Sequence, residues 1–151
     1  MGGYGASSGR IKEDFYYDTG GYKVKDDNAI TVGEYYIKRG YYVAFLQENP
    51  PHKRADLSVE GVHVEVKGMT STNTNKVANN IREAFEQIKG DDYKYPESLY
   101  QAERVVILSK YQTLREAYKI VYGGFRKAKS KGFIPDFGEV YLLHKNEMIK
   151  F

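Results

Sequence analysis

The sequence has no cysteine and no tryptophan, and it holds only four prolines among its 151 residues. Without cysteine the chain has no disulfide, no thiolate nucleophile and no zinc site built on cysteine. Any metal must therefore be held by carboxylate, carbonyl, water or imidazole, and this donor set suits Mg²⁺ or Mn²⁺.

Long hydrophobic runs are also missing. No apolar stretch approaches the roughly 18 residues of a membrane span. The first ten residues, MGGYGASSGR, lack the apolar centre of a signal peptide. We therefore expect a soluble chain. Its net charge of +3 permits a nucleic-acid partner without requiring one. The fifteen tyrosines can stack on bases, but half-buried packing is the simpler interpretation of them.

Periodicity predicts one domain over residues 28–151, preceded by a flexible or partly ordered lead over residues 1–27. A first helix is expected after Asp27 or Asn28 as N-cap, ending at Gly40, and a second after Thr74 or Asn75. The predicted order is α-β-β-β-α-β-α-β, which indicates an α/β (α+β) fold with a central mixed sheet flanked by helices. Strands are expected at residues 41–47, 57–59, 62–67 and 104–109, a third helix at 114–125, and a closing strand or hairpin at 139–151.

The stretch RADLSVEGVHVEVKG, residues 54–68, is typical of a β-hairpin with Glu60 and Gly61 in the turn. In that register Leu57, Val59, Val62, Val64 and Val66 share one face, and Asp56, Ser58, His63, Glu65 and Lys67 share the other. Asp56 then lies directly opposite Glu65. Two carboxylates about 5 Å apart repel each other unless a cation lies between them. A solvent-exposed polar face is the alternative interpretation.

Glu34 falls on or beside the apolar stripe of the first helix. A buried carboxylate needs a partner or a metal, so Glu34 is a third candidate ligand. The alternative is a capping box in which Glu34 bonds the backbone of Thr31 at a helix start.

This set of residues resembles the PD-(D/E)xK nuclease superfamily. The shared pattern is a helix glutamate, a strand, an aspartate, and then Glu65-Val66-Lys67, followed by a helix and an apolar strand. Within that superfamily the chain is similar to the tRNA-cleaving C-terminal toxin domains of contact-dependent growth inhibition proteins. The similarity rests on Glu34, GYYV at 40–43, Asp56, EVKG at 65–68, and residues 84–87. Ala55 stands where the family name has proline.

The resemblance implies a PD-(D/E)xK restriction-endonuclease-like core and a metal-dependent nuclease, specifically a toxin-type RNase that cleaves tRNA. Glu34, Asp56 and Glu65 would hold Mg²⁺ or Mn²⁺, and Lys67 would position or activate the attacking water. It also implies an immunity protein as partner and delivery from a larger secreted or surface protein into the cytoplasm of a target cell.

Further candidate substrate contacts are polar residues close to the motif in the sequence: His52, Lys53, Arg54, His63, Asn80 and Gln87. The alternative interpretation is a solvated loop for residues 52–54, an exposed sheet histidine for His63 and an ordinary polar helix side for Asn80, while Gln87 is a candidate because the resemblance implies a helix glutamine at the site. The basic run RKAKSKG at 126–132 can track a phosphate backbone, or it can simply be a solvated helix end.

Two other functions remain open from the sequence. One is a DNA endonuclease of the same fold, acting in repair, restriction or recombination. The other is a non-catalytic nucleic-acid-binding module, against which the intact set Glu34, Asp56, Glu65 and Lys67 argues.

Overall fold

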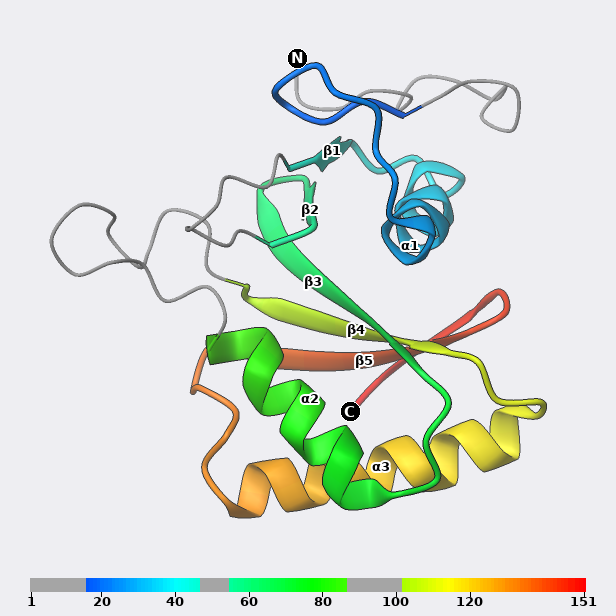
Figure 1. The fold of residues 1–151 in the computed structure, drawn as a ribbon, viewed down its shortest axis with the longest axis vertical. Coiled ribbons are helices and arrows are strands. Elements are labelled where there is room, and N and C mark those ends of the chain that lie inside the picture. Colours follow the sequence, from blue (N-terminus) through cyan, green and yellow to red (C-terminus); the bar gives the residue numbers. More distant parts are fainter. Residues whose placement is uncertain (1–15, 47–54, 87–101) are drawn as a thin grey trace, which may run out of the picture.

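The computed structural model describes residues 16–46, 55–86 and 102–151 (Figure 1). Over these residues the chain forms three helices and six strands. In chain order they are α1 (Asp27–Ile37), β1 (Val43–Phe45), β2 (Leu57–Val59), β3 (Val62–Met69), α2 (Thr74–Glu86), β4 (Arg104–Ser109), α3 (Leu114–Ser130), β5 (Glu139–His144) and β6 (Glu147–Lys150).

The strands form one open mixed sheet in the order β1-β2-β3-β4-β5-β6. Strands β1, β2 and β3 pair antiparallel, β4 and β5 continue parallel to β3, and β6 returns antiparallel. One hydrophobic core forms between α1 and one face of the sheet, and a second forms between α2, α3 and the other face. Figure 1 shows α1 on one side of the sheet and the two longer helices on the other. The expected mixed sheet with flanking helices is confirmed.

The helix starts differ slightly from those expected. Helix α1 is capped by Asp26, whose carboxylate accepts hydrogen bonds from the backbone of Asn28 and Ala29. Helix α2 is capped in the same manner by Asn73, whose side chain accepts from the backbone of Asn75. Because Asp and Asn are both strong N-caps, each helix starts earlier than the sequence analysis placed it, by up to two residues.

Helix α3 continues through Gly123 and Gly124, where the sequence pattern weakens. The cause is contact between helices: a Cβ placed on Gly124 would lie 2.4 Å from the Cβ of Val77 in α2. Glycine at this position allows α2 and α3 to approach each other closely, which completes the core on that face of the sheet.

The segment from Tyr16 to Asp26 runs beside β1. Tyr16 is 4% exposed and packs against Phe45 of β1, with ring centroids 5.0 Å apart. Isolated bridges join Tyr17 to Lys23 and Asp18 to Phe45. Residues 16–26, part of the lead expected from the sequence, therefore pack along the β1 edge of the sheet.

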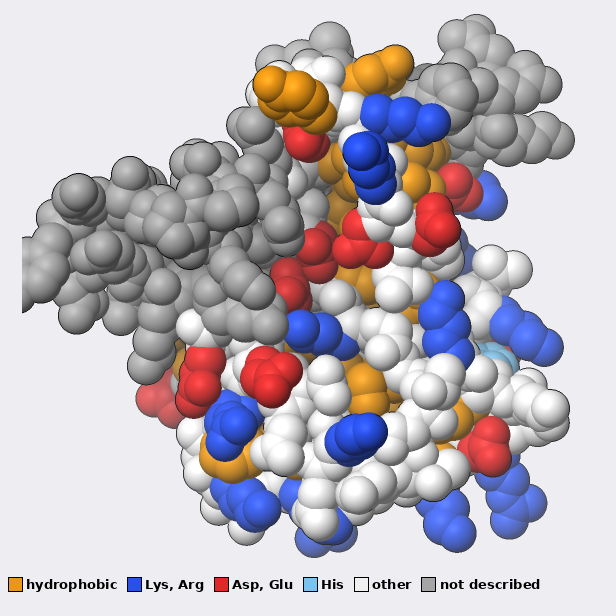
Figure 2. All heavy atoms as spheres, viewed as in Figure 1, with side chains coloured by type: hydrophobic (Ala, Val, Ile, Leu, Met, Phe, Trp, Pro, Cys, Tyr) orange, Lys and Arg blue, Asp and Glu red, His pale blue; other side chains and the backbone are white. Residues whose placement is uncertain are grey.

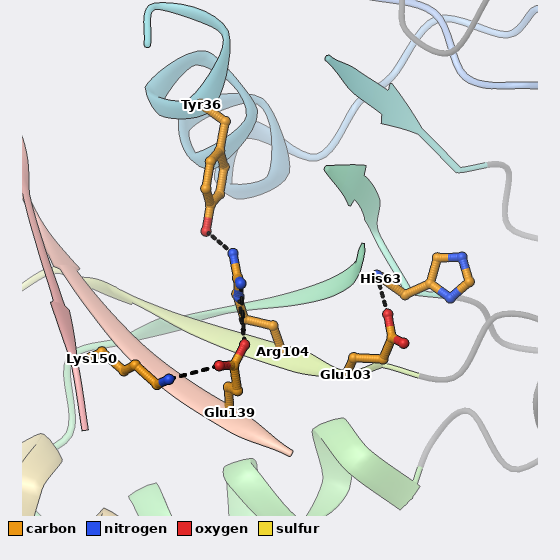
Figure 3. A network of polar contacts seen from close by, with 6 residues as sticks. All are labelled: Tyr36, His63, Glu103, Arg104, Glu139 and Lys150. Atoms are coloured by element: carbon orange, nitrogen blue, oxygen red, sulfur yellow. Dashed lines mark hydrogen bonds and ion pairs between the residues drawn. The ribbon is translucent and has the colours of Figure 1, made fainter. Parts of the chain in front are cut away.

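A polar network connects α1 to the other end of the sheet (Figure 3). Arg104 of β4 donates to the Tyr36 hydroxyl at 3.1 Å and to the carboxylate of Glu139 at 3.1 Å. Lys150 of β6 lies 2.8 Å from the same carboxylate. Within the described ranges, no helix combines the length and apolar character that crossing a membrane requires.

Candidate active site

The predicted hairpin register is confirmed by the structure. Val59 pairs with Val62, Ser58 with His63, and Leu57 with Val64. Gly61 has a φ of 88°, which is the left-handed conformation that the turn needs from glycine. Continuing this register by one residue places Asp56 opposite Glu65.

Asp56 lies where β3 extends beyond its pairing with β2. Its Oδ2 accepts a hydrogen bond of 2.8 Å from the backbone N–H of Val66. The same residue's carbonyl accepts from the N–H of Leu46, beyond the end of β1. These bonds hold the Asp56 carboxylate beside the middle of β3.

Glu65 is a buried acid, with 7% of its surface exposed. It lies beside Val105 of β4, which belongs to the hydrophobic core on the α2 side of the sheet. Burial raises the pKa of Glu65 from 4.5 to about 9, and Asp56 adds to the rise through its charge and a side-chain hydrogen bond. In the absence of a cation, the pair therefore retains a proton at neutral pH.

Lys67 lies two residues along β3, on the same face as Glu65. Its Nζ is 3.9 Å from Oε2 of Glu65, and its side chain is 19% exposed. Its charge lowers the pKa of Glu65, but burial and Asp56 outweigh that effect. The structure thus brings together three of the four predicted catalytic residues: Asp56, Glu65 and Lys67.

The fourth predicted residue, Glu34, has a different environment. It forms an ion pair with Lys38, one turn along α1, at 3.8 Å, and its side chain is 27% exposed. The alternative capping box is excluded, because α1 starts at Asp27 and the Thr31 hydroxyl donates to the carbonyl of Asp27 inside the helix. Glu34 is therefore a partly exposed acid whose partner is a lysine.

Asp26, which the sequence analysis did not single out, is the acid at the start of α1 whose charge reaches Glu65. Its charge acts on Glu65 and raises the pKa of that residue further. Because a helix rises 1.5 Å per residue, Glu34 lies about 12 Å along the axis from Asp26. Gly68 explains how the start of α1 approaches β3: a Cβ at Gly68 would lie 2.7 Å from the amide nitrogen of Asn28.

A cleft of about 570 Å³ opens beside Asp26 and Asp56, and Glu65 and Lys67 are not among its lining residues. Its walls include Asp26 and Asp56 together with Lys23, Lys25 and Tyr22 of the N-terminal segment. Tyr22 is 67% exposed. Figure 2 shows acidic side chains gathered in the middle of this face, with Lys or Arg side chains on either side of them. Cations flanking an acidic centre suit a ligand that carries both phosphate and a metal.

Of the remaining predicted contacts, the structure describes only His63 and Asn80. His52, Lys53, Arg54 and Gln87 lie outside the described residues. His63 is half-buried on β3, and its backbone N–H donates to Glu103 at 3.0 Å (Figure 3). Asn80 uses its side chain to donate to the carbonyl of Lys76 within α2.

Among the described residues, no three acidic or histidine side chains are grouped as a complete metal site. The Asp56 and Glu65 pair nonetheless fits Mg²⁺ or Mn²⁺, because Mg²⁺ commonly binds through one or two carboxylates and retains several waters. A cation would also remove the repulsion that raises the pKa of Glu65.

Comparison of the chain with protein-family models, with curated proteins and with solved structures finds no match. The site must therefore be interpreted from its own geometry. Sequence reasoning missed Asp26, Lys23 and Lys25. The run DDNA at 26–29 held the signal for Asp26, since the first of two adjacent aspartates can cap the helix.

Proposed function

We propose that this protein is a metal-dependent endonuclease of the PD-(D/E)xK type that hydrolyses phosphodiester bonds in RNA, with tRNA as its substrate. The observation that carries the proposal is the pairing of Asp56 with Glu65 across the hairpin, with the Lys67 amine 3.9 Å from Glu65. The order α1-β1-β2-β3-α2-β4 supports it, since it matches the core order on which the resemblance rests.

The acids have separate roles in this proposal. Asp56 and Glu65 hold Mg²⁺ or Mn²⁺, and Asp26 adds negative charge from the start of α1. The ion, when bound, supplies Lewis-acid stabilisation of the phosphate and lowers the pKa of a coordinated water. Glu65 loses its proton when the cation binds, because opposite charge favours the ionised carboxyl.

The cations act on the phosphate. Lys67 holds the attacking water and stabilises the negative charge that develops on the phosphoryl oxygens as water adds to phosphorus and the P–O bond to the leaving ribose oxygen breaks. Lys23 and Lys25 line the cleft beside the acids and bind phosphates of the flanking nucleotides.

Burial of Glu65 favours a catalytic over a purely binding role. A carboxyl at 7% exposure next to a second carboxyl lowers stability at neutral pH, and phosphate binding alone has no use for two opposed acids. RNA is preferred over DNA because of the resemblance to tRNA-cleaving toxin domains. The same resemblance makes an immunity protein that covers the cleft part of the proposal.

A cleavage assay tests this function. Purified protein is incubated with total tRNA and, separately, with plasmid DNA, each with Mg²⁺, Mn²⁺ or EDTA. Asp56→Asn is run alongside, because it keeps an oxygen that can accept from the Val66 N–H while removing the charge. Glu83→Gln, an exposed change on α2, is the matched control.

We expect metal-dependent tRNA cleavage by the wild type and by Glu83→Gln, and none by Asp56→Asn. Cleavage of plasmid DNA alone would replace the RNase proposal with a DNA endonuclease. Inertness on both substrates would contradict the catalytic proposal.

A further inference from the structure

One face of α3 carries a row of stacked aromatic rings that the proposed active site does not use. We name Tyr118, Tyr122, Phe125 and Phe151 the aromatic stack. The three α3 members are spaced four and three residues apart, so they share one face of the helix. Tyr118 and Tyr122 lie 5.6 Å apart between centroids at an interplanar angle of 18°.

The stack is held in place at its far end by the sheet. Phe151 donates its backbone N–H to the carbonyl of Val140 at 3.0 Å, and its ring lies 5.5 Å from that of Phe125 at 25°. The stack remains accessible, since Tyr118 is 42% exposed and Tyr122 37% exposed. Phe151 is tilted by 49° and 31° against Tyr118 and Tyr122, whereas neighbouring rings of α3 lie at 18° and 23°. The accessible rings of Tyr118 and Tyr122 are suited to stacking against another flat group.

Cations are interleaved with these rings. The guanidinium of Arg126 lies 5.9 Å from the Tyr122 ring centroid, and the Lys129 amine lies 5.8 Å from that of Phe125. Helix α3 also carries Arg115 and Lys119, and its acidic residue is Glu116. The Lys127 amine lies against α2 instead, where it donates to Thr74 and Asn75. Two copies of this face would bring like charges together, so the charge disfavours self-association and favours an anionic partner.

A cleft of about 490 Å³ continues from the stack. Phe125, Phe137 and Phe151 line it together with Lys129 and Lys150, and Phe137 is 52% exposed. Its acids are Asp136 and Glu139, and Glu139 is already paired with Lys150 and Arg104. Because Lys150 is paired with Glu139, the lining groups that match a nucleobase and its phosphate are the aromatic walls and Lys129.

We propose that the aromatic stack and this cleft bind an unpaired stretch of RNA, with bases stacked on Tyr118 and Tyr122 and phosphates bound by Lys119, Arg126 and Lys129. Bases stack on aromatic side chains whatever their identity, and cations follow the backbone. The ligand's identity as RNA rests on the proposed function; the surface itself is independent of the acids.

The position of the stack defines the class of substrate. Helix α3 and the segment that lines the acidic cleft lie toward opposite ends of the longest axis in Figure 1. A short oligonucleotide contacts only one of the two sites, whereas a folded RNA of tRNA size contacts both. The substrate is therefore a folded RNA with an unpaired segment at a distance from the cleaved bond.

Binding of fluorescein-labelled tRNA, followed by anisotropy in EDTA over a range of salt, tests the proposal without cleavage. Tyr122→Leu removes the ring but keeps apolar packing, and Tyr122→Phe keeps the ring. Lys119→Ala with Arg126→Ala removes two cations beside the stack. Lys38→Ala with Lys76→Ala removes two exposed cations from α1 and α2 and is the matched control.

We expect Tyr122→Leu to weaken binding at least about fivefold, and Tyr122→Phe to have little effect. The Lys119 and Arg126 pair should lower the slope of log Kd against log salt by about 1.4, at roughly 0.7 per lost phosphate contact with a single strand. Replacing Lys38 and Lys76 should leave this slope unchanged. Folding of each variant is checked by its thermal midpoint.

Equal loss in both double variants, or tRNA binding unaffected by Tyr122→Leu, would overturn the proposal. Equal binding of poly-glutamate and tRNA would overturn it in favour of a surface for acidic proteins. These results are separable from the proposed function. An Asp56→Asn variant that fails to cleave tRNA yet binds it normally supports both the nuclease proposal and the RNA-binding surface. A wild type that binds tRNA through Tyr122 but cleaves nothing contradicts only the nuclease proposal.

Discussion

The Asp56 carboxylate accepts a hydrogen bond of 2.8 Å from the backbone N–H of Val66, the residue between Glu65 and Lys67. This bond joins the end of β2 to the centre of β3, so the backbone of the E-V-K segment itself positions the opposing acid. The arrangement explains how Asp56 is held beside Glu65. The pKa of Glu65 in this pair can be tested without any substrate, through its effect on stability.

Stability without metal should fall as pH rises, because of Glu65. Its pKa is about 9 in the folded protein and 4.5 when exposed, so between these values the folded state binds more protons than the unfolded state. Unfolding free energy then decreases from pH 4.5 to pH 9. Glu65→Gln, which cannot ionise, should equal the wild type near pH 4 and exceed it by at least about 1 kcal/mol at pH 8.

Urea denaturation at pH 4, 6 and 8 in EDTA measures this difference. Glu83→Gln on α2 is the control, because that acid is exposed. A constant difference between Glu65→Gln and the wild type at all three pH values would show that Glu65 titrates normally.

Asp26 and Glu34 should differ sharply in their effect on activity. Asp26→Asn removes the charge near Glu65 but keeps helix capping, since Asn caps as well as Asp. We expect it to lower metal affinity and cleavage about tenfold or more, in line with loss of an acid near a metal ligand. Glu34→Gln removes only the ion pair with Lys38 and should leave cleavage of tRNA unchanged. The reverse ranking in a cleavage assay would restore Glu34 to the site.

Lys67→Ala should abolish most of the turnover without preventing metal binding. Loss of a group that stabilises developing charge costs about a hundredfold or more in kcat, while KM for tRNA should change little. Lys76→Ala, an exposed lysine on α2, is the control for charge removal. Normal kcat in Lys67→Ala would remove Lys67 from the mechanism.

Much of this architecture is predictable from the sequence. The hairpin register follows from alternation and the Glu60-Gly61 turn, and the strand RVVILS is observed as β4 with the expected bounds. Local patterns of this type depend only on neighbouring residues. They therefore predict these elements correctly without knowledge of the rest of the fold.

Other features depend on contacts between distant residues. The close approach of the start of α1 to β3 depends on the contact of Asn28 with Gly68, and no local pattern encodes that contact. The burial of Glu65 depends likewise on the parallel pairing of β3 with β4. The position of the segment before α1 along the β1 edge depends on Tyr16 packing against Phe45.

Gly124 should be among the least tolerant positions in α3. A Cβ there would lie 2.3 Å from Cγ1 of Val77, so Gly124→Ala must push α2 and α3 apart. We expect a loss of about 1 to 3 kcal/mol in unfolding free energy, the usual cost of overpacking. Gly123→Ala meets only the Thr74 methyl at 3.0 Å and gains helix propensity, so it should be nearly neutral. Similar thermal midpoints for both variants would contradict this packing.

The proposed metal site is tested most directly by calorimetric titration of Mn²⁺ at pH 7 in two buffers of different ionisation enthalpy. Because Glu65 has a pKa of about 9 without metal, it must lose its proton as the cation binds. We predict one binding site, close to one proton released per Mn²⁺, and no measurable binding to Asp56→Asn. Absence of Mn²⁺ binding to the wild type, or binding without proton release, would contradict a metal held between Asp56 and Glu65.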